Sequence, residues 1–267
     1  MMVSRSMFFI VFTFLFFMNH HHYVSAVGNF LHFRHFTHQN LKNITLSGDS
    51  HLRHKQISLT KDPNVPSLSS GSMVYNNPLP FFDRKRNASV AYFATMFTFR
   101  INNKKHSASG DGLTFFISAV PPAPTPTATG EAGYFGLVNA AQTSIGKFIA
   151  IEFDTKRDLV FKDPEGDHVG LDIDSLVSVK TAEPKNSGID LKSGALIYAS
   201  IYYHNDQKKL QVYLNDAPEV PNKTAMEVDV DLSPHFEEQM FVGFSASSSN
   251  RSTELHHIKS WDFWMNY

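Results

Sequence analysis

The chain has 267 residues, a formal net charge of −1 and no cysteine. Because the charge is near zero and no basic patch stands out, the composition argues against a nucleic-acid-binding protein. The absence of cysteine excludes a fold held by disulfides, and a chain of this length buries enough surface to fold without them.

The first 26 residues have the layout of a secretory signal. Arg5 is the only charged residue before the run Met7–Met18 (MFFIVFTFLFFM), and Val24-Ser25-Ala26 suits cleavage. Twelve residues are too few to cross a bilayer as a helix, which disfavours the alternative of an N-terminal anchor. We predict a signal peptide over residues 1–26 and a secreted domain over 27–267 that does not span a membrane.

Sequons for N-glycosylation occur in the mature region. A secreted chain with several N-x-S/T sequences is expected to carry glycans on some of them. The acceptor residues would be Asn43, Asn87, Asn222 and Asn250.

Short β-branched and aromatic runs between turn residues predict an all-β domain, and helical periodicity is almost absent. Continuously apolar runs such as 113–118 and 148–153 predict buried strands, and residues 195–203 and 210–214 predict a hairpin across the polar turn 204–207. Many strands at near-regular spacing favour a sandwich or a jelly roll. Further strands are expected at 89–101, 240–245 and 258–264, and a surface loop at 121–130.

The stretch 151–175 (IEFDTKRDLVFKDPEGDHVGLDIDS) concentrates acidic residues at the end of a predicted strand. Glu152 and Asp154 point to the same face of that strand, where two carboxylates repel unless a cation lies between them. Oxygen ligands in a loop suit calcium, and a histidine beside carboxylates suits a first-row metal such as manganese. The alternative is a solvated acidic loop. The candidate ligands that follow the strand are Asp158, Asp163, Asp167 and His168.

The spacing of this stretch closely resembles the metal loop of the legume lectins, with acidic residues four and nine positions after Asp154 and a histidine fourteen positions after it. The resemblance implies that Glu152 and His168 bind only a manganese-type ion and that Asp154 and Asp163 bridge both ions. It also implies that the side chain of Asp158 and the main-chain carbonyl of Lys156 bind calcium alone. Asp167 would have no ligand role and would lie in solvent.

Other motifs extend the resemblance along nearly the whole mature chain, and it implies the concanavalin A-like jelly-roll β-sandwich of the family. The matching segments are Asn40-Leu41, Leu46–Asp49, Gly110–Phe116 (GDGLTFF), Gly133–Leu137 (GYFGL), Val242–Ala246 and Trp261–Phe263.

By resemblance, Asp111, Gly133 and Asp158 would bind a sugar, and the peptide bond before Asp111 would be cis. Two positions depart from the family pattern. Asp158 stands where asparagine is usual, and a carboxylate cannot donate a hydrogen bond to a sugar. Lys156 stands where an aromatic ring usually stacks on the sugar. In these features the chain resembles the extracellular domains of plant lectin receptor kinases more than it does seed lectins.

The leading interpretation is a non-enzymatic, secreted carbohydrate-binding protein that binds calcium and manganese, or another first-row metal. Its partners would be glycans or glycoproteins, and it would act in the apoplast or cell wall, with a role in plant defence. Members of this family can form homodimers. The alternative is a lectin-like domain that has lost affinity for monosaccharides and binds a protein or an apolar ligand. A glycoside hydrolase is disfavoured, because Lys156 occupies the position at which a second catalytic carboxylate would stand. The sequence ends at Tyr267, just after the last expected strand, and no kinase domain is expected.

Overall fold

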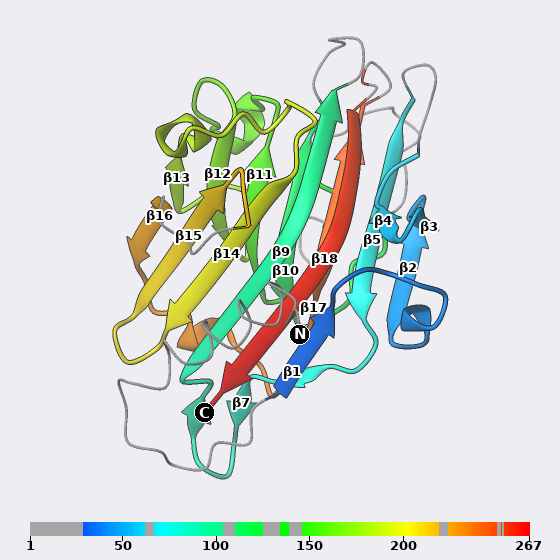
Figure 1. Ribbon diagram of the computed structural model, residues 1–267. Coiled ribbons are helices and arrows are strands. Elements are labelled where there is room, and N and C mark those ends of the chain that lie inside the picture. Colours follow the sequence, from blue (N-terminus) through cyan, green and yellow to red (C-terminus); the bar gives the residue numbers. More distant parts are fainter. Residues whose placement is uncertain are drawn as a thin grey trace, which may run out of the picture.

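The computed structural model describes residues 29–61, 67–103, 110–124, 134–138, 146–218, 224–249, 252 and 254–267. Within these residues the chain forms two eight-stranded antiparallel sheets packed face to face, here called the β9 sheet and the β10 sheet after a central strand of each (Figure 1). The all-β sandwich predicted from the sequence is confirmed.

The β9 sheet lies in front in Figure 1. Strand β1 (Asn29–Phe33) pairs with β18 beside the main path of the sheet. The main path runs β16 (Thr224–Asp229), β15 (Lys209–Asn215), β14 (Ile197–His204), β9 (Tyr92–Asn103), β18 (Glu254–Asn266), β4 (Gln56–Ser58) and β3 (His51–Arg53).

The β10 sheet lies behind it, and β6 (Leu79–Pro80) pairs with one of its strands, β17. A separate two-stranded hairpin joins β7 (Phe82–Asp83) to β8 (Ala88–Ser89). The order of the β10 sheet is β13 (Lys180–Ala182), β12 (His168–Ile173), β11 (Phe148–Asp154), β10 (Gly112–Ser118), β17 (Gln239–Ser248), β5 (Ser69–Tyr75) and β2 (Ile44–Gly48).

The main core fills the space between the sheets and is rich in aromatic rings. Phe97 of β9 meets Phe244 of β17 edge to face, with ring centroids 4.8 Å apart. A second apolar cluster covers the other face of the β10 sheet, where Phe116 and Phe148 pack against Phe135 and its neighbours. Because β10 and β11 are buried on both faces, their sequences are continuously apolar instead of alternating.

Several strands of the N-terminal third lack a clear strand signal in the sequence. Strand β5 reads SSGSMVY, yet nearly all of it is buried. Its serines and glycine leave room for close neighbours: a Cβ on Gly71 would lie 2.2 Å from the carbonyl oxygen of Leu59.

In the part of the chain that the structure describes, no helix is long and apolar enough to cross a membrane.

Candidate metal and carbohydrate site

Three neighbouring strands bring the predicted ligands together at the upper end of the β10 sheet in Figure 1. Asp154, the last residue of β11, lies opposite Gly112 of β10 and opposite His168, the first residue of β12. Glu152 is two residues earlier on β11, so its side chain shares the face of Asp154. Strand register alone therefore places two carboxylates beside one imidazole.

The side chains of Glu152, Asp154 and His168 form a compact buried group. The Nε2 atom of His168 lies 2.9 Å from Oε1 of Glu152 and 3.9 Å from Oδ2 of Asp154. One ligand atom from each of the three lies within 4.8 Å of the others, and the residues are only 1–3% exposed. Gly170 opposite Glu152 provides the room, since a Cβ there would lie 2.1 Å from Oε1 of Glu152.

The negative charges of this buried group favour the binding of a cation. Burial and the adjacent carboxylate of Glu152 raise the pKa of Asp154 to about 10, and the N–H of Lys156 opposes this only in part. Burial opposes a charge on His168, yet its hydrogen bond with Glu152 and the carboxylates of Glu152 and Asp163 raise its pKa. A divalent cation between these groups would offset the repulsion, so the residues fit the metal site that the sequence predicted.

The loop between β11 and β12 folds back on its own carboxylates. The N–H of Lys156 donates to Oδ1 of Asp154 at 2.6 Å, and the N–H of Asp158 donates to Oδ2 of Asp163 at 2.5 Å. Asp163 is buried, and burial raises its pKa. The structure thus gathers Asp158 and Asp163 at the same end of β11 as Asp154.

Asp167 does not lie in solvent, so that expectation is wrong. Its carboxylate is 14% exposed and forms an ion pair with Nζ of Lys192 at 2.7 Å. The lysine comes from the segment that precedes β14, a contact that the metal-loop spacing cannot indicate.

Sequence reasoning missed two polar residues that hold Glu152 in place. The hydroxyl oxygen of Ser178 lies 2.5 Å from Oε1 of Glu152 and 2.8 Å from Oδ1 of Asp172, so its single proton joins it to one or the other carboxyl group. Asp172 is fully buried on β12, and burial raises its pKa well above the ordinary value. The alternation of β12 puts Asp172 on the face of His168 and Gly170, which is the signal that could have identified it.

Asp111 lies buried beside this group. Its carboxylate accepts a hydrogen bond from the Ser247 hydroxyl, and its N–H donates to the carbonyl oxygen of Ser247 at 3.2 Å. The expected cis peptide before Asp111 is wrong, because the described residues contain no cis peptide bond. The preceding N–H, that of Gly110, is held by a hydrogen bond of 3.1 Å to the carboxylate of Glu254. Gly133, the other predicted sugar contact, lies outside the described residues.

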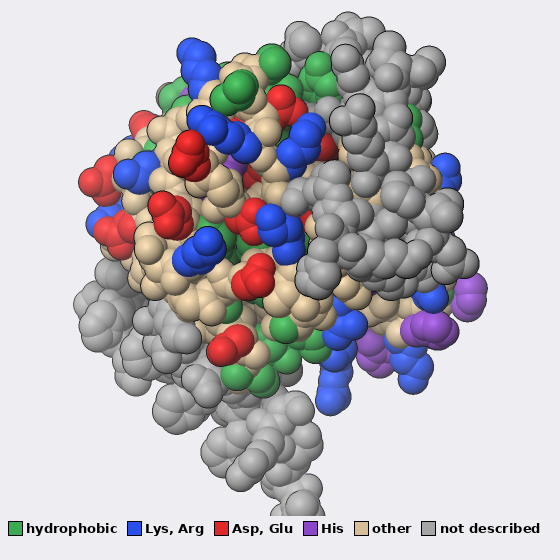
Figure 2. All heavy atoms as spheres, turned by 90° about the horizontal axis from the view of Figure 1, so that it is seen from above, with side chains coloured by type: hydrophobic (Ala, Val, Ile, Leu, Met, Phe, Trp, Pro, Cys, Tyr) green, Lys and Arg blue, Asp and Glu red, His purple; other side chains and the backbone are tan. Residues whose placement is uncertain are grey.

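A small hollow opens between Asp111 and the metal loop, with Phe135 at its base. The ammonium of Lys156 lies in this region, 3.1 Å from Oδ2 of Asp158 and 3.7 Å from Oδ1 of Asp111. Burial opposes its charge, but the two carboxylates outweigh burial and raise the pKa of Lys156. Figure 2 looks onto this end of the molecule, where acidic and basic side chains alternate around visible hydrophobic ones.

The hollow has an aromatic side chain that sequence reasoning did not identify. Phe161 lines it from the short 3₁₀ helix Leu159–Phe161 and meets Tyr134 edge to face, with centroids 5.6 Å apart. The two residues before it, Leu159 and Val160, are 71% and 77% exposed. The position of Lys156 therefore lacks a ring, but the site as a whole does not.

Two of the four sequons lie on described surface. Asn43 and Asn87 are exposed, as an acceptor asparagine must be. Asn222 and Asn250 lie outside the described residues.

Comparison with known proteins places this sandwich and its acidic loop in a family. The family model described as "Legume lectin domain" matches residues 29–267 of this chain. The chain belongs to the legume lectin family. It is 34% identical over 222 residues to the galactose-binding lectin of Arachis hypogaea, covering 82% of this chain and 76% of that one.

Other relatives are receptor kinases. The chain is 43% identical over 249 residues to a probable L-type lectin-domain containing receptor kinase, S.7 of Arabidopsis thaliana, covering 90% of this chain and 35% of the kinase. It thus spans only about a third of the length of the receptor kinases it matches. Among solved structures, the lectin UEA-II complexed with galactose has a TM-score of 0.74 and 29% identity, over 90% of this chain and 99% of that one.

Proposed function

We propose that this legume lectin domain is a metal-dependent carbohydrate-binding protein. The observation that carries the proposal is the buried group of Glu152, Asp154 and His168, which lies beside a hollow that Asp111 also lines. Glu152 and His168 would hold a first-row ion such as manganese, and Asp154 and Asp163 would face both ions. Asp158 and the carbonyl of Lys156 would hold calcium.

When bound, the two cations supply positive charge between carboxylates that otherwise repel one another. Two hydrogen bonds within the chain then fix the loop. Asp154 accepts one from the backbone N–H of Lys156, and Asp163 accepts one from the backbone N–H of Asp158. A loop fixed in this way holds Asp158 in place beside Asp111 at the hollow, where both would contact a sugar. Preorganisation of this kind lowers the cost of binding a flexible, strongly hydrated ligand.

We further propose that simple sugars bind weakly and that larger glycans bind better. Asp158 cannot donate to a sugar hydroxyl, and its carboxylate is already engaged by Lys156. The missing donor and the missing ring would each remove about 1 kcal/mol, which together weaken binding by roughly thirtyfold. Phe161, on the loop side of the hollow, would instead contact the further residues of a larger glycan.

Titration calorimetry tests this proposal in the presence of calcium and manganese. The ligands are mannose, glucose, galactose and a branched glycan, and the variant is Lys156→Phe with Asp158→Asn. We expect weak or absent binding of the monosaccharides, tighter binding of the branched glycan, and restored monosaccharide binding in the double variant. A variant that keeps its metals and still binds no sugar would show that the cause of weak binding lies outside these two positions.

A second candidate function is recognition of a protein or an apolar ligand. Exposed Leu159 and Val160 beside the hollow favour it, since neighbouring apolar side chains on a loop are a common feature of contact sites. Leu159→Ser with Val160→Ser separates the two functions. The pair of changes leaves glycan affinity unchanged if the hollow alone binds sugar, and abolishes capture of an apolar ligand if the loop binds it.

We also propose that the protein is secreted to the apoplast or cell wall, with a role in plant defence. The signal-like residues 1–26 lie outside the described residues, and exposed Asn43 and Asn87 support glycosylation. N-terminal sequencing of protein from plant tissue is expected to begin at or near Val27. A membrane fraction that retains Met7–Met18 would contradict secretion by cleavage. Homodimerisation, which is possible in this family, is tested by light scattering of the purified domain.

A further inference from the structure

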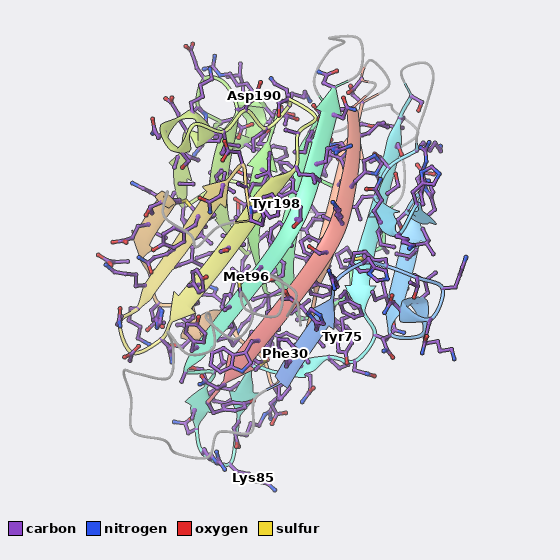
Figure 3. All side chains as sticks on the ribbon, in the orientation of Figure 1. Phe30, Tyr75, Lys85, Met96, Asp190 and Tyr198 are labelled. Carbon is purple, nitrogen blue, oxygen red and sulfur yellow. The ribbon has the colours of Figure 1, made fainter. Side chains whose placement is uncertain are left out.

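A second group of charged side chains lies on the opposite sheet, on the face turned away from the core. In β9 the residues Phe97, Phe99 and Ile101 enter the core, so Arg100 points outward with Met96, two pleats away. Figure 3 labels Met96 on the sheet that faces the viewer. His257 of β18 lies directly opposite Arg100 and also points outward, because its neighbour Ile258 is in the core.

The row continues across two more strands. Ser58 of β4 lies opposite His257, and His51 of β3 lies opposite Ser58. Side chains directly opposite one another in antiparallel strands have Cβ atoms about 5 Å apart. Arg53, two residues after His51, is on the same face. The result is a basic cluster of Arg100, His257, His51 and Arg53.

Two members of this cluster carry a buried side-chain nitrogen without a hydrogen-bond partner. His257 is 7% exposed, and its Nδ1 atom is buried without a hydrogen bond. Nε of Arg100 is likewise buried without a partner. No carboxylate among the described residues forms an ion pair with either side chain. A buried polar atom without a partner costs free energy, and an oxyanion that reached the cluster would accept a hydrogen bond from Nε of Arg100.

The surrounding sequence adds positive charge and almost no negative charge. Residues 29–61 contain five Lys or Arg and five His but a single acidic residue, Asp49. That carboxylate is engaged elsewhere, by Ser69, by the N–H of Ser70 and by Lys61 at 3.4 Å. Nδ1 of His51 donates to the main-chain carbonyl of Asp49, at 3.0 Å, and not to a carboxylate among the described residues. In Figure 2, histidines gather with Lys and Arg at one edge of the molecule.

We infer that Arg100, His257, His51 and Arg53 form a binding site for a single oxyanion group: a carboxylate, a sulfate or a phosphate. A guanidinium presents parallel N–H donors to two oxygens of such a group, and an imidazole adds another donor. The site is separate from the calcium-side hollow, because it lies on the outer face of the β9 sheet. An acidic saccharide, a sulfated one and free phosphate all carry the required chemistry.

Calorimetry of the full chain with sodium sulfate, sodium phosphate and galacturonate, at constant ionic strength set by chloride, tests the inference. We expect saturable binding of at least one of the three, and the order of affinities identifies the source of the oxyanion. Arg100→Gln should weaken binding at least about tenfold, because it removes a charge-assisted hydrogen bond. Lys180→Gln removes the same charge from an exposed position of β13 and should leave the affinity unchanged.

The NMR titration of the His257 ring gives a readout that a merely structural role would not move. The charged groups that face His257 are Arg100 from β9 and His51 and Arg53 from β3, with His256 on its own strand. A bound anion offsets their repulsion, so the pKa of His257 should rise when the anion saturates the site. An unmoved pKa, or binding that is equal in wild type and Arg100→Gln, would overturn the inference.

Should Arg100→Gln fail to fold, Arg53→Gln and Arg100→Lys carry the test. The first removes one charge from the β3 side of the cluster, and the second keeps the charge but loses the fork of donors. Both should weaken anion binding. If adding chloride gave the same heat changes as adding sulfate, phosphate or galacturonate, the effect would be nonspecific screening of charge. That result would overturn the inference.

Discussion

The acidic group at the end of the β10 sheet and the basic cluster on the face of the β9 sheet pose the same physical problem with opposite signs. Each holds like charges, or donors without acceptors, at positions shielded from water. Glu152, Asp154 and His168 come from adjacent strands of one stretch of chain. The basic cluster draws its residues from positions 51, 53, 100 and 257. The difference shows that two sites can be equally well defined in the structure although only one of them has a recognisable pattern in the sequence.

Removal of the cations should have the largest effect and should act on the acidic group alone. A ligand at about a hundred times its dissociation constant stabilises the fold by about 3 kcal/mol. For a domain of this size that corresponds to a midpoint shift of about 10 °C. We expect a chelator to lower the thermal midpoint of metal-loaded protein by this order and to leave the NMR signals of the basic cluster in place.

Asp154→Ala sharpens this prediction. The variant should lose the stabilisation by calcium and manganese, because Asp154 faces both proposed ions. It should melt close to chelated wild type, since the change also removes a carboxylate that Glu152 and Asp163 repel. A midpoint that the chelator does not move, in wild-type protein shown to start metal-loaded, would contradict the proposed site.

The pH dependence should differ between the loaded and the chelated protein. In the metal-free fold the pKa of Asp154 is raised to about 10, so the native state binds a proton that the unfolded state has released. Stability of the chelated protein therefore falls as pH rises above about 4. Bound metal requires the carboxylate form, so the gap between loaded and chelated midpoints should be wide at about pH 8 and narrow toward about pH 4. A gap that is constant with pH would show that Asp154 is not a ligand.

Much of the fold could be predicted because β10, β11 and the late strands are long, apolar and bounded by turns. Strand β5 could not, since buried serines and a glycine satisfy close packing without a strand-like composition. The grouping of Glu152, Asp154 and His168 was predictable because these residues are separated by short spacings in the sequence. Ser178 and Glu254 reach the site only through tertiary packing, and the pairing of Asp167 with Lys192 has the same origin. Phe161 lies within the metal loop itself, but nothing in the ligand spacing marks it as a residue that lines the hollow.

The basic cluster should lower stability in mildly acidic solution. Burial, together with the positive groups around it, lowers the pKa of His257 to about 4. Between that value and the ordinary pKa of histidine the unfolded state binds the extra proton, so stability falls as pH drops. From about pH 7 to about pH 5 the loss should be on the order of 2 kcal/mol.

His257→Gln, measured by denaturant unfolding at both pH values in metal-loaded protein, should lose about 2 kcal/mol less than wild type over this range, because the contribution of His168 is common to both proteins. His38 is exposed and serves as the matched position, because His38→Gln should leave the slope as it is. Saturating sulfate should reduce the slope in wild type if the cluster binds an oxyanion. Equal slopes in wild type and His257→Gln would mean that another group controls the acid response.

The smallest expected effect distinguishes a ligand of the metal loop from a neighbour of it. Asp167 lies next to His168 in the chain and is half-buried, as a ligand would be, but its carboxylate meets Lys192 at 2.7 Å. Burial raises the pKa of Asp167 despite that partner, so the ion pair compensates its desolvation incompletely and contributes little to stability. Asp167→Ala should therefore cost less than about 1 kcal/mol and leave calcium affinity unchanged, against complete loss in Asp154→Ala. Calcium titrations of the two variants side by side measure the contrast. If Asp167→Ala weakened calcium binding as much as Asp154→Ala does, the assignment of ligands along residues 152–168 would be shifted, and Asp167 would have to be counted among them.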